Sequence, residues 1–223
     1  MNTNTAAEQE IVYPDSDGMT MADNTLQYAG IVTIMGNLDA LFAANPNVFV
    51  AGDNLIYPVK GDNTIRQAPD VYVAFGRPKG HRGSYKVWEE GGIFPQVVFE
   101  VLSPGNRAGE MKKKRQFYRT YGAEEYYVID PEDGVAEGWV REGDEFREVD
   151  EMNGFVSPRL GIRFDTSGEQ LVITHPDGRP FQTFQQVVDR AREAERQAER
   201  QKQENDRLRA MLRAAGIDPD KSG

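Results

Sequence analysis

Two acids and one lysine in this 223-residue chain have the types and positions that phosphoester chemistry needs. Asp70 opens a strand-like run directly after Pro69, and Glu100 lies inside the apolar run QVVFEVL at 96–102. A charged side chain in such a run is costly unless it is paired, protonated or metal-bound. Two carboxylates at neighbouring strand ends can hold a hard divalent cation, Mg²⁺ or Mn²⁺, which polarises a phosphate oxygen and lowers the pKa of a bound water. The alternative is a structural ion pair with an arginine.

Lys114 is the lysine that helical spacing directs toward these acids. Residues 108–121 predict a helix ending at Gly122, and one face of it carries Met111, Lys114, Tyr118 and Tyr121. Lys112 points nearly opposite to this face, and Lys113 lies to one side and is the second choice. An ammonium beside the carboxylates would orient the attacking water or stabilise the charge that develops on phosphorus. The alternative is a lysine whose stem packs while its amine reaches solvent.

Two further residues are secondary candidates for the same site. Asp53 follows the strand-like run 48–52 and could add a metal ligand or a water contact, although such an Asp is more commonly a turn residue. Tyr118 lies one helical turn beyond Lys114, where it would pack or hold the lysine by a hydrogen bond.

The charge of the chain is unevenly distributed. The net charge is −10, but residues 60–121 hold twelve Lys or Arg against six acids. A basic, glycine-rich loop in this segment suits sequence-independent contacts to a phosphate backbone. Its candidate nucleic-acid-binding residues are Arg77, Lys79, Arg82 and Lys86. A solvated surface loop with no ligand is an equally good interpretation.

The elements that would position these residues belong to an α/β domain. A helix is predicted from a cap at Asp23 or Asn24 to Pro46, with Leu26 and Ile31 in its apolar stripe. The segment 96–130 predicts a strand, helix and strand, and 138–149 predicts a hairpin. Further strands are predicted at 48–52, 54–59 and 70–76. The expected organisation is a flexible segment at 1–22, a domain at 23–178 and a helical tail at 182–216.

Four segments of the domain resemble the Uma-type family of restriction endonucleases, which belongs to the PD-(D/E)XK nuclease superfamily. They are APDVYV at 68–73, VVFEVLSPGNR at 97–107, EMKKKRQFY at 110–118 and YGAEEYYVIDP at 121–131. The resemblance covers about residues 20–165, and it implies a restriction-endonuclease-like mixed central sheet flanked by helices. It also implies that Asp70 and Glu100 match the metal-binding acids. Leu102 stands where the superfamily has a lysine, and Lys114 matches the position from which this family supplies it.

The tail carries a heptad pattern. One core position holds Phe184, Ala191, Ala198, Asn205 and Leu212, and the other holds Val187, Ala194, Gln201, Leu208 and Ala215. This spacing favours a coiled coil that pairs two copies of the chain, although many small residues make the seam weak. A single exposed or docked helix is the alternative.

Composition narrows the function classes. The chain has no cysteine, so disulfides, zinc–thiolate sites and cysteine nucleophiles are excluded. It has neither a membrane-length apolar run nor a signal-peptide pattern, so we expect a soluble, cytoplasmic protein with no membrane partner. The leading hypothesis is a divalent-metal-dependent DNA endonuclease. The alternatives are a catalytically silent nuclease-fold module that binds nucleic acid or protein, and a phosphoesterase acting on RNA or small molecules.

Overall fold

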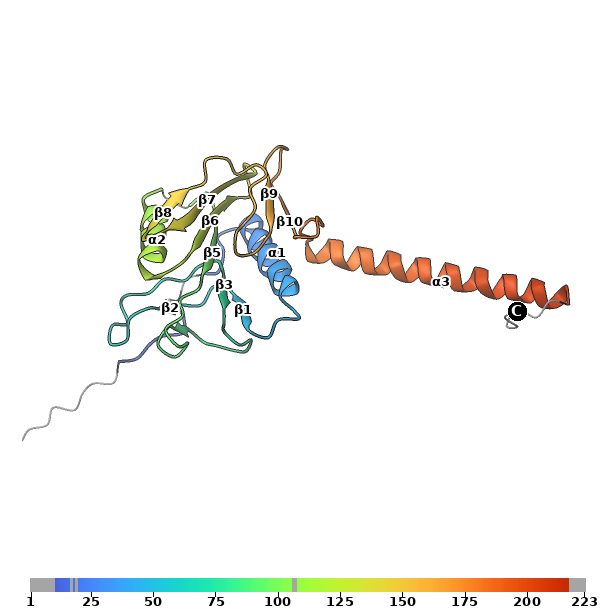
Figure 1. Ribbon diagram of the computed structural model, residues 1–223, viewed down its shortest axis with the longest axis horizontal. Coiled ribbons are helices and arrows are strands. Elements are labelled where there is room, and N and C mark those ends of the chain that lie inside the picture. The colour runs from blue at the N-terminus through green and yellow to red at the C-terminus, as the bar shows by residue number, and fades with distance from the viewer. Residues whose placement is uncertain (1–10, 17, 19, 106–107, 217–223) are drawn as a thin grey trace, which may run out of the picture. The chain divides into compact units, whose positions relative to one another are not determined.

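A computed structural model describes residues 11–16, 18, 20–105 and 108–216 (Figure 1). The chain divides into two compact units, residues 1–181 and 182–223. The first unit contains the sheets and two helices, and the second contains one long helix. Arg107 of the segment SPGNR and most of the predicted flexible segment lie outside the described residues.

A six-stranded mixed sheet forms the centre of the first unit, as predicted. Its strand order is β1-β3-β5-β6-β7-β8. The central pair β5·β6 is parallel, and the remaining neighbours are antiparallel. The strands are β1 (Val48–Ala51), β3 (Val71–Phe75), β5 (Val97–Val101), β6 (Glu125–Asp130), β7 (Val135–Glu142) and β8 (Glu145–Glu148).

Two helices cover the two faces of this sheet. Alternate residues of β5 point to opposite faces, so Phe99 packs with α1 (Thr25–Leu41) and Val98 packs with α2 (Ala108–Tyr121). Helix α2 has the predicted bounds and connects the parallel strands β5 and β6. This is the predicted strand–helix–strand unit, and it gives the α2 face of the sheet its own buried cluster.

Helix α1 differs from its prediction in length and in its buried face. Asn24 caps it by accepting from the Gln27 backbone N–H, and the helix ends at Leu41, before Pro46. Leu26 was expected in the apolar stripe, but it is 47% exposed, and Gln27 is buried instead. The inward face therefore begins one residue later than the apolar pattern indicated.

Two small sheets complete the unit. The pair β2 (Ile56–Tyr57) and β4 (Tyr85–Lys86) is parallel, and β9 (Arg163–Asp165) pairs antiparallel with β10 (Val172–Thr174). The predicted strand 54–59 is therefore reduced to two residues. Strands β4, β9 and β10 were not predicted.

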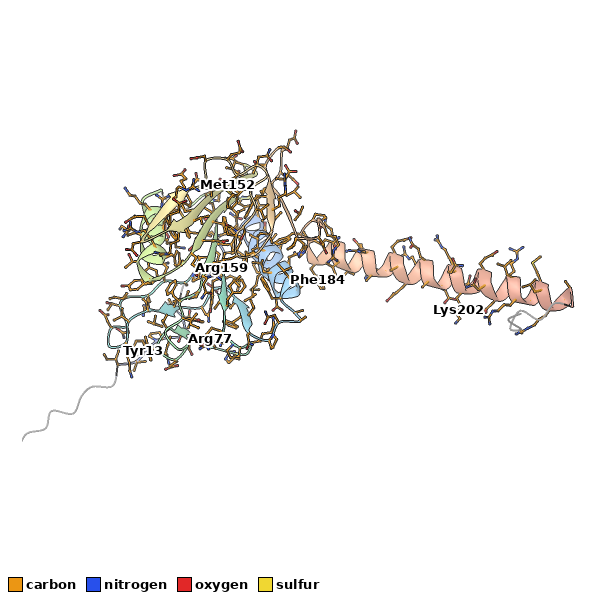
Figure 2. All side chains as sticks on the ribbon, in the orientation of Figure 1. Tyr13, Arg77, Met152, Arg159, Phe184 and Lys202 are labelled. Carbon is orange, nitrogen blue, oxygen red and sulfur yellow. The ribbon has the colours of Figure 1, made fainter. Side chains whose placement is uncertain are left out.

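Part of the predicted flexible N-terminal segment contacts this unit. The Tyr13 ring, labelled in Figure 2, packs against Tyr57 and Trp88. The Tyr57 hydroxyl donates to the Pro14 carbonyl at 2.8 Å.

The second unit contains the helix α3 (Phe184–Ala214). Thr183 and Gln186 form a capping box at its start, in which each side chain binds the other residue's backbone N–H. None of its residues is buried, and its side chains stand exposed along the helix (Figure 2). In the described part of the chain, no helix combines the length and apolar character needed to cross a membrane.

Candidate active site

The sheet register brings the two predicted acids to one face. Strand β3 pairs with β5 so that Val71 lies opposite Phe99 and Tyr72 lies opposite Val98. Continuing this antiparallel register by one residue sets Asp70 opposite Glu100. Glu100 follows the alternation of Val98 and therefore projects to the α2 face, as does Asp70. The two carboxylates thus share the face that carries Lys114, at the carboxyl end of β5.

Glu100 is held by two donors from α2. It is 1% exposed. The Lys114 Nζ donates to its Oε2 at 2.8 Å, and the Tyr118 hydroxyl donates to its Oε1 at 2.9 Å. The Lys114 side chain is only 14% exposed, so its amine does not extend into solvent. The partner of Glu100 is the lysine selected by helical spacing, whereas the neighbouring Lys113 is exposed.

Asp70 is fixed by the backbone of two neighbouring strands. Its Oδ2 accepts from the Val101 N–H at 2.6 Å, and no donor among the described residues contacts its other oxygen. The backbone that follows β1, at Gly52 and Asp53, lies close to the backbone of Pro69 and Asp70. The Asp53 N–H donates to the Pro69 carbonyl at 2.9 Å, and a Cβ on Gly52 would lie 2.1 Å from the Asp70 carbonyl oxygen. Glycine at position 52 is therefore required for this contact.

The site has an excess of negative charge. Burial, and then the neighbouring Glu100 carboxylate, raise the pKa of Asp70 to about 7, against the opposing effects of the Val101 N–H and Lys114. Burial also raises the pKa of Glu100, although Lys114 and Tyr118 oppose it. For Lys114, burial lowers the pKa, but the Glu100 and Asp70 charges outweigh it and the net shift is upward. Two carboxylates therefore face one ammonium.

These residues fit a divalent cation. Mg²⁺ and Mn²⁺ prefer oxygen ligands, and Mg²⁺ is commonly bound by one or two carboxylates together with waters and substrate phosphates. Asp70 and Glu100 supply two carboxylates, and each retains unused lone pairs. Among the described residues no group of three or more His, Cys, Asp or Glu could hold a metal, so a cage made wholly of protein ligands is not present there.

The secondary candidate Asp53 lies near this cluster. It has a left-handed backbone conformation with φ of 56°, which suits a turn residue. Its charge is nonetheless close enough to raise the pKa of Asp70 slightly.

The four predicted nucleic-acid-binding residues are each paired with an acid. Arg82 donates to Glu90 at 2.5 Å and lies over the Phe49 ring, and its side chain is 12% exposed. A phosphate would have to compete with an existing ion pair at each of these positions. The pairs are Arg77–Glu90 (3.9 Å), Lys79–Asp39 (2.8 Å), Arg82–Glu90 (2.5 Å) and Lys86–Glu89 (3.5 Å).

Gln27 is a residue of the site region that the sequence analysis missed. Its Nε2 donates to the Val101 carbonyl at 2.8 Å, and its Oε1 accepts from the Asp23 N–H at 2.8 Å. It therefore ties α1 to the same backbone residue whose N–H binds Asp70. The available signal was its place in line with Ile31, Ile34 and Leu38, because a polar residue there must be buried.

Comparison with known proteins identifies a family that this chain matches. The family model Uma2, described as "Putative restriction endonuclease", matches residues 31–167, more than half of the chain. No curated protein matches the chain. The chain is also similar to a crystal structure from Anabaena variabilis described as a "putative nuclease belonging to DUF820". That likeness has 14% sequence identity and a TM-score of 0.46, and it covers 60% of this chain and 72% of that chain.

Proposed function

The chain belongs to the Uma2 family, and on this basis we propose that it is a divalent-metal-dependent endonuclease that hydrolyses DNA phosphodiester bonds. Family membership and the restriction-endonuclease-like mixed sheet support a nuclease function in general. The observation that carries the finer proposal is the convergence of Asp70, Glu100 and Lys114. Asp70 directly precedes β3, Glu100 lies in β5 and Lys114 lies in α2, and the Lys114 amine lies 2.8 Å from Glu100.

Each residue has a defined part in this proposal. Asp70 and Glu100 hold the Mg²⁺ or Mn²⁺ ion. When bound, the ion polarises a phosphate oxygen and lowers the pKa of a water. Lys114 stays protonated because its pKa is raised, and its ammonium orients the attacking water or stabilises charge on the phosphate oxygens. Tyr118 is a positioning residue whose hydroxyl fixes the Glu100 carboxylate. Asp53 is a candidate for an additional ligand or water contact.

Metal binding is the first test. Isothermal titration of the full chain with Mn²⁺ should show binding that Asp70→Asn and Glu100→Gln each remove. Asp39→Asn is the matched control, because Asp39 is an exposed acid paired with Lys79 and should leave binding unchanged. If the unmodified chain binds no Mn²⁺, the proposed metal site is wrong.

Substrate class is the second test. Supercoiled plasmid should be nicked with Mn²⁺ and left intact in EDTA, and Lys114→Met should abolish nicking while retaining Mn²⁺ binding. Parallel incubations with single-stranded DNA, RNA and a small phosphodiester distinguish a DNA endonuclease from a phosphoesterase that acts on RNA or small molecules. Cleavage of RNA or the small ester alone would contradict DNA as the substrate.

A catalytically silent binding module remains a second candidate because of one observation. Both Glu100 oxygens already accept hydrogen bonds from α2, so this carboxylate is satisfied without a metal. A nuclease fold can also persist without cleavage. Nucleic-acid binding that needs no Mn²⁺, with no nicking under any metal condition, would favour this module.

We also propose that α3 pairs two copies of the chain as a coiled coil. Along its 31 residues it buries none, and it exposes Phe184, Val187 and Leu208 at predicted heptad core positions. Sedimentation equilibrium should give twice the chain mass, and Leu208→Glu with Leu212→Glu should give the monomer. Gln203→Glu, outside the heptad core, is the control. A monomeric unmodified chain would exclude this pairing.

A further inference from the structure

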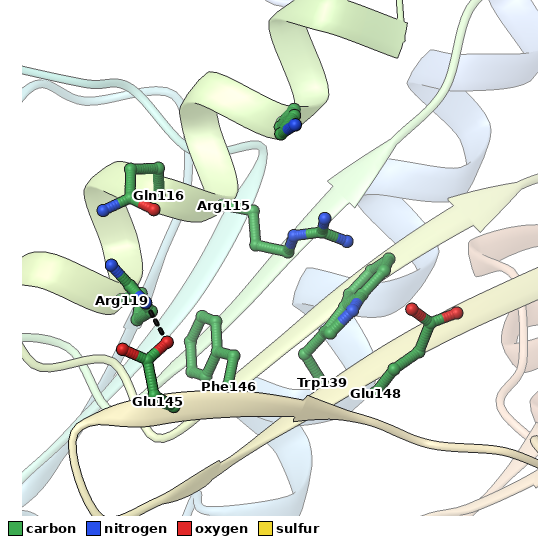
Figure 3. Close-up of a pocket in the computed structure, with 8 residues that line it drawn as sticks. Arg115, Gln116, Arg119, Trp139, Glu145, Phe146 and Glu148 are labelled. Carbon is green, nitrogen blue, oxygen red and sulfur yellow. Dashed lines mark hydrogen bonds and ion pairs between the residues drawn. The ribbon is translucent and has the colours of Figure 1, made fainter.

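A groove with basic and aromatic walls lies beside α2, and neither Asp70 nor Glu100 lines it. It encloses about 280 Å³ between α2 and the strands β7 and β8 (Figure 3). This volume is close to the lower limit of small-ligand sites, roughly 300 Å³. The α2 wall carries Lys112, Arg115, Gln116 and Arg119, and the strands contribute Trp139 and Phe146.

The α2 wall is a continuous stripe on one flank of the helix. Its residues occur at spacings of three, one and three, which keeps them on one side of a helix. Lys114 and Tyr118 occupy a different side, where they contact Glu100. One helix therefore presents the site lysine to the sheet and a second set of cations to the groove. Lys112 begins the stripe only two residues from Lys114.

Arg115 is the central cation of this groove. Its guanidinium carbon lies 4.2 Å from the centroid of the Trp139 ring, and Figure 3 shows the side chain directed from α2 toward that ring. Among the described residues no carboxylate forms an ion pair with Arg115 or Lys112, in contrast to the four bases of the loop at 77–86. A guanidinium supported by an indole offers its outer face to a second planar group, and nucleobases stack on such surfaces.

The groove also contains acids that a phosphate must overcome. Arg119 pairs with Glu145, as the dashed line in Figure 3 marks, and Glu148 lies beside Trp139. The three bases exceed these two acids by one charge. A single anion would gain little from that balance, whereas a strand with successive phosphates can engage Lys112 and displace Glu145 from Arg119.

A polar atom without a partner lies behind the aromatic wall. Tyr126 is fully buried, and its hydroxyl has no hydrogen-bond partner among the described residues. Its ring packs against Trp139 and Phe146 on the groove side and against Tyr118 on the active-site side. Burial raises the pKa of Tyr126, Glu100 raises it further and Arg115 opposes the shift.

We propose that this α2–β8 groove binds a polynucleotide strand, with a base stacked on Arg115 and phosphates at Lys112 and Arg119. The inference rests on the proposed nuclease function and gives the substrate a path that begins beside Lys114. It assigns strand binding to the flank of α2 where, among the described residues, Arg115 and Lys112 form no ion pair with an acid.

Strand binding is measured with a fluorescein-labelled oligothymidylate of about 12 nucleotides, on the full chain in EDTA. We expect Arg115→Ala to weaken binding roughly tenfold, and Arg115→Lys to recover only part of this because it restores charge without a planar face. Lys112→Ala should lower the slope of log K against log salt by about 0.7, the value for one phosphate contact on a single strand. Arg147→Ala is the matched control, because Arg147 is an exposed β8 arginine that pairs with Glu142 and does not line the groove.

A second readout reports on the groove directly. The chain has two tryptophans, so Trp88→Phe leaves Trp139 as the sole tryptophan, whose emission is excited selectively at wavelengths that tyrosine does not absorb. Adding unlabelled oligothymidylate should change Trp139 emission with the same midpoint as the binding isotherm. Unchanged emission while the strand binds would overturn the inference.

The outcomes separate this inference from the proposed function. If the groove variants bind the oligonucleotide as tightly as Arg147→Ala does while the unmodified chain nicks plasmid, the groove inference fails and the nuclease proposal stands. If the unmodified chain binds no oligonucleotide, the groove inference fails whatever the plasmid assay shows. If the groove variants bind the oligonucleotide more weakly but bind Mn²⁺ with unchanged affinity, the groove inference is supported independently of catalysis.

Discussion

Replacing Asp70 with asparagine removes one of two carboxylates that face each other across β3 and β5, and we expect it to stabilise the fold at pH 8. The reason is that burial, and then the neighbouring Glu100 charge, disfavour the ionised Asp70 carboxylate more than the Val101 N–H and Lys114 favour it. The asparagine can still accept the Val101 N–H that Asp70 Oδ2 accepts at 2.6 Å. It can also donate toward Glu100, so the local hydrogen bonding survives the change.

The size of the effect follows from proton linkage. An unfolded Asp has a pKa of about 3.9, and the folded Asp70 has a pKa of about 7. Between these values the folded state keeps a proton that the unfolded state releases, so stability falls as the pH rises through this window. The full gap corresponds to about 4 kcal/mol at 1.36 kcal/mol per pK unit. Because Asp70 is not fully buried and water screens part of this effect, we expect the ionised carboxylate to lower the stability of the fold by about 2 kcal/mol above pH 7. At pH 5 about a third of this effect is present.

Urea unfolding at pH 5 and pH 8 in EDTA measures this effect, with tryptophan emission as the probe because both tryptophans lie in the first unit. The stability difference between Asp70→Asn and the unmodified chain should widen by about 1.3 kcal/mol from pH 5 to pH 8. Asp39→Asn, an exposed control, should change stability by less than about 0.5 kcal/mol at both pH values. If Asp70→Asn is less stable at pH 8, or if the difference does not depend on pH, then Asp70 is not the strained carboxylate inferred here.

Three further changes test other parts of the site. Lys114→Met should lower the free energy of unfolding by about 3 kcal/mol at pH 8, because it leaves the buried Glu100 charge without its ammonium. The loss should become smaller at low pH, where Glu100 is protonated. Equal urea midpoints of this variant and the unmodified chain at pH 8 would contradict this. Gly52→Ala should lower the free energy of unfolding by at least about 2 kcal/mol and weaken Mn²⁺ binding in titration, since the new Cβ would meet the Asp70 carbonyl oxygen. The control is Gly36→Ala, at an open helical position, which should leave stability unchanged or raise it. Gln27→Leu should cost about 1–2 kcal/mol in urea and weaken Mn²⁺ binding, because it frees the end of β5 from α1; unchanged Mn²⁺ affinity would show that its role is structural only.

The centre of the fold was predictable because its signals are local. The apolar run around Glu100 indicated a strand covered on both faces, and the spacing from Met111 to Tyr121 fixed which side of α2 faces the sheet. These two periodicities were enough to select Lys114 over Lys113. They were sufficient because a strand and the helix that follows it keep their faces when the unit assembles.

The parts that were missed depend on contacts distant in sequence. The strands β2 and β4 have only two residues each and pair with each other although β3 lies between them in the sequence, so neither segment carries a periodic pattern of its own. Helix α1 has apolar residues on several sides, which left its buried face ambiguous by one position between Leu26 and Gln27. The role of Arg82 was also hidden, because composition shows a base in a loop but does not reveal the acid at position 90 that folds back onto it.

The arrangement at the carboxyl end of β5 is difficult to explain by stability alone. A buried ion pair such as Lys114–Glu100 contributes little net stability compared with apolar residues of similar volume. Adding Asp70 beside it makes folding less favourable above the raised pKa of Asp70, since burial and then the Glu100 charge oppose ionisation of Asp70. A cation that binds the folded state alone would offset this cost, and at a concentration of about 100 times its Kd it would add about 2.7 kcal/mol. Mn²⁺ should therefore stabilise the unmodified chain and leave Asp70→Asn unchanged, so removing the acid and adding the metal relieve the same repulsion. If Mn²⁺ stabilised both proteins equally, its site would lie elsewhere and the paired carboxylates would have no explanation in metal binding.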